Sequence, residues 1–73
     1  YKIYMTIAMQ IGKMLKEERT IKGYSQKKIA DMLAMSQQQY SLCEKGMAEL
    51  HYGQILSVCK VYGISPNEFF EDI

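Results

Sequence analysis

The sequence has little of what metal sites, disulfide frameworks and catalytic centres require. Its 73 residues include only two cysteines, Cys43 and Cys59, and one histidine, His51. These side chains are too few for a zinc site, and both cysteines lie among apolar residues, which favours reduced, buried thiols. No phosphate-binding glycine loop is present, and no nucleophile or carboxylate pair accompanies His51 at a recognisable spacing. We therefore expect neither an enzyme nor a bound cofactor or metal.

Long apolar runs are also absent. No run approaches the roughly 20 residues that a membrane-spanning helix needs, and the first ten residues lack the cleavage pattern of a signal peptide. These absences predict a cytoplasmic location and no membrane partner. Because residue 1 is tyrosine rather than methionine, we expect residues 1–6 to be an N-terminal extension, either a tag or a trimmed segment, and residues 7–73 to form the domain.

The net charge is small, but the charged residues are unevenly distributed along the chain. The net charge of +1 would by itself disfavour a nucleic-acid partner. Residues 1–48, however, hold eight basic and four acidic side chains, a net +4, whereas residues 49–73 hold one basic and four acidic side chains, a net −3. A protein with one basic pole can orient on a polyanion while staying nearly neutral overall.

Apolar spacing and capping residues predict an all-α fold of five short helices, with no strand-like alternation, repeat or linker. The first helix is amphipathic and ends at Gly23, where a C-terminal glycine is expected. The fourth ends at Gly63, and the fifth starts at Pro66 with Ser65 as its cap. The apolar positions that indicate the first and fourth helices are Ile7, Ile11, Met14, Leu15 and Ile21, and then Ile55, Leu56, Cys59, and Tyr62 or Val61.

The stretch Ser25–Gly46 predicts two short capped helices joined by a tight turn. Ser25 can cap the first of them, and Ser36 with Gln39 forms a capping box at the start of the second. The turn, residues 34–35, is too short for the two helices to lie antiparallel, so they must cross steeply. This layout is a helix-turn-helix, and it points to DNA.

The steep crossing divides the residues of the motif between an inner and an outer side. Ala30 is small enough to permit the close approach, and Tyr40 and Cys43 turn inward. The outer side of the third helix then carries Gln37, Gln38, Ser41, Leu42 and Lys45. Glutamine can pair bidentately with adenine in the major groove, so this side suits the reading of base edges.

These residues resemble the Cro/C1-type helix-turn-helix regulators, also called the XRE family, which includes lambdoid phage repressors. The resemblance covers about residues 8–70 and is carried by Arg19, Ser25, Gln26, Ile29, Ala30, Leu33, Ser36, Gln37, Gln38, Glu44 and Gly46. It implies a compact five-helix, lambda-repressor-like domain with its helix-turn-helix at 25–46. It further implies a sequence-specific transcriptional regulator, expected to be a repressor, that binds an inverted-repeat operator in double-stranded DNA as a homodimer, associated with a bacterial or phage nucleoid.

The resemblance also implies roles for individual residues. Base contacts are expected from Gln37, Gln38, Ser41 and Leu42, with Leu42 limited to a thymine methyl group because it cannot donate a hydrogen bond. Phosphate contacts are expected from Gln26, Lys27, Ser36 and Lys45. Simpler roles compete for the two lysines, since Lys27 can be merely solvated and Lys45 can complement the helix dipole. Arg19 and Glu44 are expected to form an internal ion pair between the first and third helices.

Two departures from the family pattern stand out. Ala34 occupies a turn position that is commonly glycine in relatives, where a left-handed backbone costs an L-residue about 1–2 kcal/mol. The loop after Gly46 is apolar and acidic where relatives are polar or basic, and Glu49 in it would repel a phosphate. The apolar Met47 and Leu50 favour an alternative function, a protein-interaction module of the same fold, antitoxin-like or a co-regulator, with weak or no DNA binding of its own.

Overall fold

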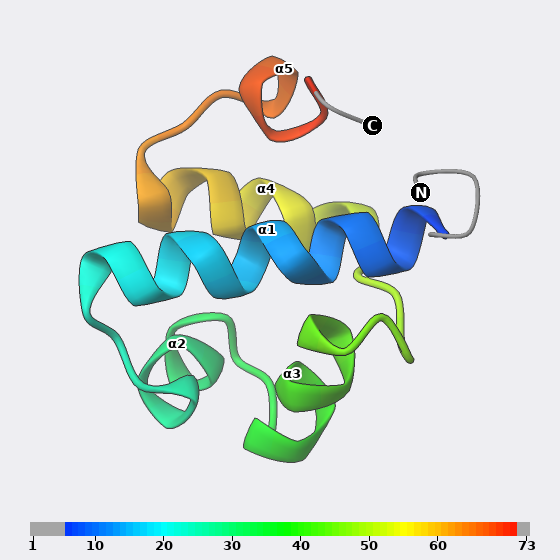
Figure 1. Cartoon of the computed structure of the whole chain (residues 1–73). Coiled ribbons are helices and arrows are strands. Elements are labelled where there is room, and N and C mark those ends of the chain that lie inside the picture. The colour runs from blue at the N-terminus through cyan, green and yellow to red at the C-terminus, as the bar shows by residue number, and fades with distance from the viewer. Residues whose placement is uncertain (1–5, 72–73) are drawn as a thin grey trace.

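The computed structural model describes residues 6–71, which form five helices and no strand. They are α1 (Ile7–Lys22), α2 (Gln26–Met32), α3 (Gln37–Glu44), α4 (Tyr52–Tyr62) and α5 (Pro66–Phe69). Helix α1 runs through the middle of the domain, with α2 and α3 on one side of it and α4 and α5 on the other (Figure 1). The predicted all-α class is confirmed. None of the helices in 6–71 combines the length and apolar character needed to cross a bilayer.

Hydroxyl side chains cap four of the helices at their N-termini. The Ser25, Ser36 and Ser65 oxygens accept hydrogen bonds from backbone N–H groups three residues later, at 3.0, 3.1 and 3.2 Å. The three predicted serine caps are therefore confirmed. Thr6 caps α1 in the same way, accepting from the Met9 N–H at 3.1 Å. Thr6 thus belongs to the folded unit, while residues 1–5 of the expected extension lie outside the described residues.

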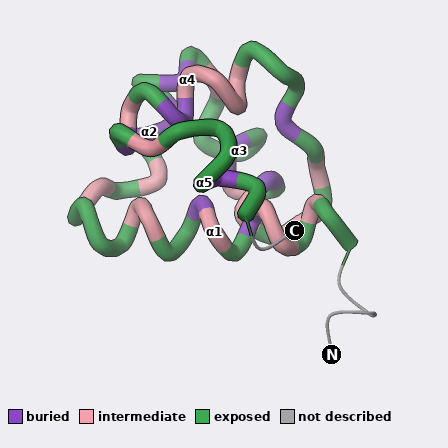
Figure 2. Tube along the Cα trace, turned by 90° about the horizontal axis from the view of Figure 1, so that it is seen from above, coloured by how far each residue is buried: buried purple, intermediate pink, exposed green. Residues whose placement is uncertain are grey.

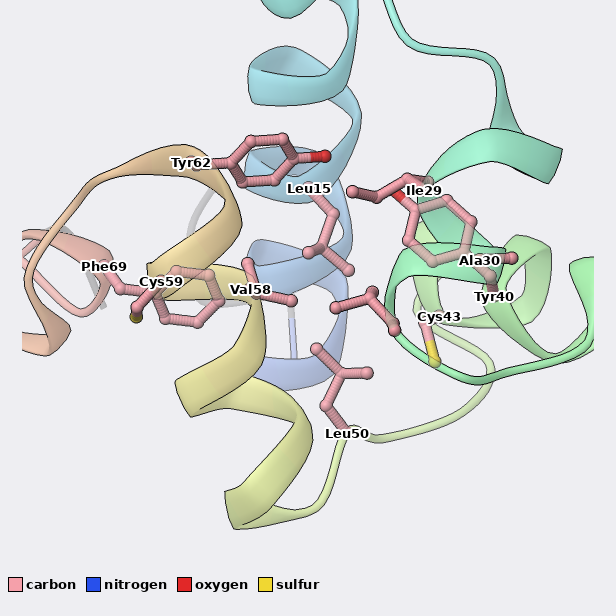
Figure 3. Packing of buried hydrophobic residues seen from close by; sticks show 11 residues of the cluster. Leu15, Ile29, Ala30, Tyr40, Cys43, Leu50, Val58, Cys59, Tyr62 and Phe69 are labelled. Atoms are coloured by element: carbon pink, nitrogen blue, oxygen red, sulfur yellow. The ribbon is translucent and has the colours of Figure 1, made fainter.

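Every helix contributes a fully buried side chain to one core. Leu15, Ile29, Tyr40, Val58 and Phe69, one from each helix in chain order, are at most 1% exposed. The close-up in Figure 3 shows most of them gathered around Leu15 of the central helix. The predicted inward positions of the helix-turn-helix, including Tyr40, are confirmed.

The predicted apolar stripe of α1 is wrong at its two ends. Ile7 and Ile21 are 59% and 76% exposed, because they lie in the first and last turns of a 16-residue helix, where the other helices do not cover them. Between the ends, buried and half-buried positions alternate with exposed ones along α1 (Figure 2). In α4, Tyr62 rather than Val61 is buried. Val58, which the apolar spacing did not single out, is completely buried.

The turn between α2 and α3 contains a left-handed alanine. Ala34 has φ 56°, and it is the one non-glycine residue of the described chain with positive φ. The turn is closed by two backbone hydrogen bonds, from the Ala34 N–H to Asp31 O at 3.2 Å and from the Met35 N–H to Ala30 O at 2.9 Å. The turn therefore holds Ala34 in a left-handed conformation that is strained for an L-residue.

Candidate nucleic-acid interface

The outer side of α3 and the start of α2 border a shallow open groove. The residues that line it are Gln26, Gln37, Gln38, Ser41, Leu42 and Lys45. All six are residues that the sequence predicts to contact DNA, four through bases and two through phosphates. The structure thus brings together, on one surface, residues that lie up to 19 positions apart in the chain.

The rotation of α3 about its axis explains why these side chains face outward. Tyr40 and Cys43 are 0% and 2% exposed, so their side of α3 packs against the core. Residues three or four positions apart share a helix face, which places Gln38, Ser41 and Leu42 on the opposite side. Leu42 remains 36% exposed, an apolar side chain set between the glutamines and Lys45.

The two other predicted phosphate contacts, Ser36 and Lys27, lie outside the groove lining. The Ser36 oxygen accepts from the Gln39 N–H, but a hydroxyl that accepts can still donate its own hydrogen to a phosphate. The Lys27 ammonium lies 3.5 Å from the Asp31 carboxylate, and both side chains are largely exposed. Such a surface pair contributes little, about 0–1 kcal/mol, so it does not hold Lys27 away from a ligand.

A half-buried ion pair joins α1 to the end of α3. Arg19 Nε and Nη2 donate to Glu44 Oε2 and Oε1 at 2.6 and 3.2 Å, a two-pronged contact. The remaining guanidinium nitrogen, Nη1, donates to the Tyr24 carbonyl oxygen at 2.9 Å. All three guanidinium nitrogens therefore have protein acceptors, and the arginine ties α1, α3 and the loop before α2 together.

The Glu44 carboxylate receives a second donor from α2. Gln26 Nε2 lies 3.0 Å from Glu44 Oε1 and donates a hydrogen bond to it. Burial alone would raise the pKa of Glu44, but the Arg19 guanidinium, the Tyr40 hydroxyl and the Gln26 amide beside the carboxylate outweigh burial, and the pKa is lowered from its ordinary value. The carboxylate is therefore ionised at neutral pH. Sequence reasoning missed the Gln26 contact because the two residues are 18 positions apart and no local pattern joins them.

The loop after α3 differs from its expected apolar surface. Met47 is 72% exposed, but Leu50 is only 9% exposed and joins the core cluster (Figure 3). Leu50 turns inward because the loop crosses from α3 to α4 over the end of the core. The apolar loop surface that favoured a protein-interaction module is thus smaller than the sequence predicted. Within 6–71, no group of three or more metal-ligating side chains comes together.

A capped helix crossing a second helix through a tight turn, with polar side chains on the outer face of the second, defines the helix-turn-helix class of DNA-binding domains. The profile of the helix-turn-helix family matches residues 15–69, and the chain belongs to this family, the non-enzymatic Cro/C1 type that its residues resemble. The SPbeta prophage-derived uncharacterized HTH-type transcriptional regulator YonR of Bacillus subtilis (strain 168) is 39% identical over 54 residues. That alignment covers 74% of this chain and 50% of YonR, so the match spans half the length of this relative.

Proposed function

We propose that this domain binds double-stranded DNA sequence-specifically, with α3 in the major groove, and represses transcription at the operator it occupies. The observation that carries the proposal is the groove in which Gln37 and Gln38 lie beside Gln26 and Lys45, so that base-reading and phosphate-contacting groups share one surface. The similarity to YonR, whose name describes an HTH-type transcriptional regulator of prophage origin, supports a regulatory role on a bacterial or phage chromosome.

Gln37, Gln38, Ser41 and Leu42 read bases in this proposal. The two glutamines are exposed at the first turn of α3, the end of a recognition helix that enters the groove. Their amides suit the paired acceptor and donor of adenine, and the apolar Leu42 suits the methyl group of thymine. An A·T-rich half-site is the expected target.

Gln26, Lys27, Ser36 and Lys45 contact phosphates in this proposal, and so orient the domain without reading sequence. Lys45 lines the groove directly after the last turn of α3, and Lys27 stands exposed on α2. Since lysine contacts release counterions from DNA, binding should weaken steeply with salt. Two copies of the domain, related by a two-fold axis, would occupy an inverted repeat.

Selection from a random pool of duplexes tests the proposal. We expect enrichment of an inverted repeat whose half-sites are centred about 10–10.5 base pairs apart, the spacing of one helical turn. Sedimentation of the complex should then give two protein chains per duplex, and the affinity should fall as salt is raised. A pool that shows no consensus at low ionic strength would overturn the proposed function.

A further inference from the structure

The amide of Gln26 is not free to rotate at the edge of the groove. It is half-buried, and its nitrogen donates to a Glu44 oxygen at 3.0 Å. Glu44 is itself held by its surroundings, because its side chain is 4% exposed and Arg19 donates hydrogen bonds to both of its oxygens. The inward-facing Glu44 side chain therefore determines how the groove-lining Gln26 side chain is presented.

The chemistry of the pair determines which end of the amide faces the carboxylate. An ionised carboxylate only accepts hydrogen bonds, so Gln26 must turn its NH₂ group, not its carbonyl oxygen, toward Glu44. One of the two N–H bonds is used there. The second N–H is left to donate in another direction, and the groove is the open space beside it.

Arg19 keeps the carboxylate from repelling DNA. Its guanidinium lies within hydrogen-bond distance of both Glu44 oxygens, so the pair is neutral as a unit. A phosphate near Gln26 would meet an oriented N–H donor. The ion pair behind that donor carries no net charge, whereas an unpaired Glu44 carboxylate would repel the phosphate. The same arginine donates to the Tyr24 carbonyl oxygen, which fixes the chain two residues before Gln26.

We propose that Glu44 is a positioning residue for DNA binding, which holds the Gln26 amide with one N–H on the carboxylate and the other directed at a DNA phosphate. This inference rests on the proposed function and adds to it, since the ion pair with Arg19 alone would make Glu44 a purely structural residue. The positioning role predicts that Glu44 affects DNA affinity through Gln26, and only through Gln26.

A double-mutant cycle measures that dependence. Because E44Q would leave Arg19 with an unpaired charge, the main variant is R19M/E44L, which replaces the whole pair with apolar side chains of similar volume and can keep the core filled. DNA affinity is measured by fluorescence anisotropy on the selected duplex for the wild type, Q26A, R19M/E44L and the triple variant. Circular dichroism at the same temperature corrects each value for the folded fraction.

The expected losses are strongly non-additive. Q26A should weaken binding about tenfold, as the removal of one charged hydrogen bond does. R19M/E44L should weaken the wild type by about threefold or more, but should change the affinity of the Q26A protein by less than about 1.5-fold, since coupled residues are non-additive. Equal losses in both backgrounds would mean that Glu44 acts only on the fold, and would overturn the positioning role.

The free protein offers a second readout that needs no DNA. Side-chain amide signals in a ¹⁵N–¹H spectrum report on Gln26 directly, and Q26A identifies its pair of peaks. E44Q should shift the Gln26 pair and leave the pair of the exposed Gln39 in place. Unchanged Gln26 signals would overturn the positioning role of Glu44 but would leave the proposed DNA binding untouched. A wild-type protein that binds no DNA would instead overturn the proposed function and, with it, this role.

Discussion

Gly12 of α1 lies so close to Cys43 of α3 that the glycine has no room for a side chain. A Cβ built at Gly12 would lie 2.5 Å from the Cys43 carbonyl oxygen and 2.5 Å from that of Glu44. The central helix therefore packs directly against the C-terminal backbone of α3. This contact sets how far α3 projects from the rest of the domain.

Replacing Gly12 with alanine should destabilise the protein. The added methyl group meets backbone atoms, which cannot move aside as a flexible side chain can. Overpacking of this kind costs about 1–3 kcal/mol and exceeds the gain in helix propensity of about 1 kcal/mol at most. Urea denaturation should show the loss in the free energy of unfolding.

Gly53→Ala is the matched control for Gly12→Ala. Gly53 lies in the first turn of α4, and a Cβ there would meet only the His51 ring, at 3.7 Å. This substitution should be neutral or should stabilise the protein by up to about 1 kcal/mol. If G12A were as stable as G53A, the close packing of α1 on α3 would be contradicted.

The strained turn predicts a stabilising substitution. Ala34 has φ 56°, a conformation that costs an L-residue about 1–2 kcal/mol and glycine almost nothing. Ala34→Gly recovers that strain but makes the unfolded chain more flexible, which costs about 0.4–1 kcal/mol. The net gain should be about 0.5–1 kcal/mol, measurable as a rise in the thermal midpoint of several degrees.

Gly63→Ala tests the same strain in the opposite direction. Gly63 has φ 67° and open space around it, so the backbone conformation alone opposes a side chain there. G63A should lose about 1 kcal/mol. An A34G protein no more stable than the wild type would show that the turn carries no such strain.

Local signals in the sequence predicted the helices well, because helix ends depend on residues three or four positions apart. Ser25, Ser36 and Ser65 cap the helices that they were expected to cap, and Gly23 ends α1 in a left-handed conformation. Burial depends instead on which helices cover which surface. Ile21 and Leu50 were therefore misplaced, and neither is distinguished by its neighbours in the sequence.

The candidate site also has features that follow from local helix spacing and features that depend on contacts between distant residues. The outward position of Gln37 and Gln38 follows from the inward position of Tyr40, which is a matter of helix spacing alone. The hydrogen bond from Gln26 to Glu44 requires the crossing angle of α2 and α3 and the placement of α1. Contacts between distant residues of this kind become visible only in the folded structure.

The lowered pKa of Glu44 predicts a loss of stability in acid. Its stabilising contribution is fully present above the unfolded pKa, about 4.3 for glutamate, and is lost as pH falls through the lower folded value. The free energy of unfolding should therefore decrease as pH falls below about 5. E44Q should be less stable than the wild type at pH 6 but should show a shallower decrease in acid. The control is E49Q, at an exposed glutamate, whose free energy of unfolding should decrease in acid as that of the wild type does. If the free energy of unfolding of E44Q decreased just as steeply, Glu44 would be excluded as the source of the acid loss.

Tyr62 predicts a loss of stability in alkali. Its hydroxyl is buried without a hydrogen-bond partner within residues 6–71 and points from α4 across Leu15 (Figure 3). Burial raises the pKa of Tyr62 to about 12. Between about pH 10 and that value the unfolded chain ionises while the folded protein stays neutral, so stability should fall as pH rises.

The variant Tyr62→Phe isolates this contribution. It should match or exceed the wild type in stability at pH 7, since it removes an unpaired buried hydroxyl, and it should lose less stability between pH 9 and 11. The measurement is the stability of each protein over that pH range, followed by circular dichroism. The control is Tyr52→Phe, at a side chain that is 76% exposed. If the stability of Y62F fell with rising pH as steeply as that of Y52F, the alkaline loss would come from groups other than Tyr62.

The central claim is that the first turn of α3 reads DNA, and one titration tests it most directly. Anisotropy on the selected duplex compares the wild type with Q37A/Q38A, with Q39A as a control from the same turn whose side chain does not line the groove. Each good bidentate base contact contributes about 1–3 kcal/mol of discrimination, so the double variant should lose at least about 10-fold in specific affinity. Q39A should bind like the wild type. Unchanged specific binding by Q37A/Q38A would contradict the proposed role of α3.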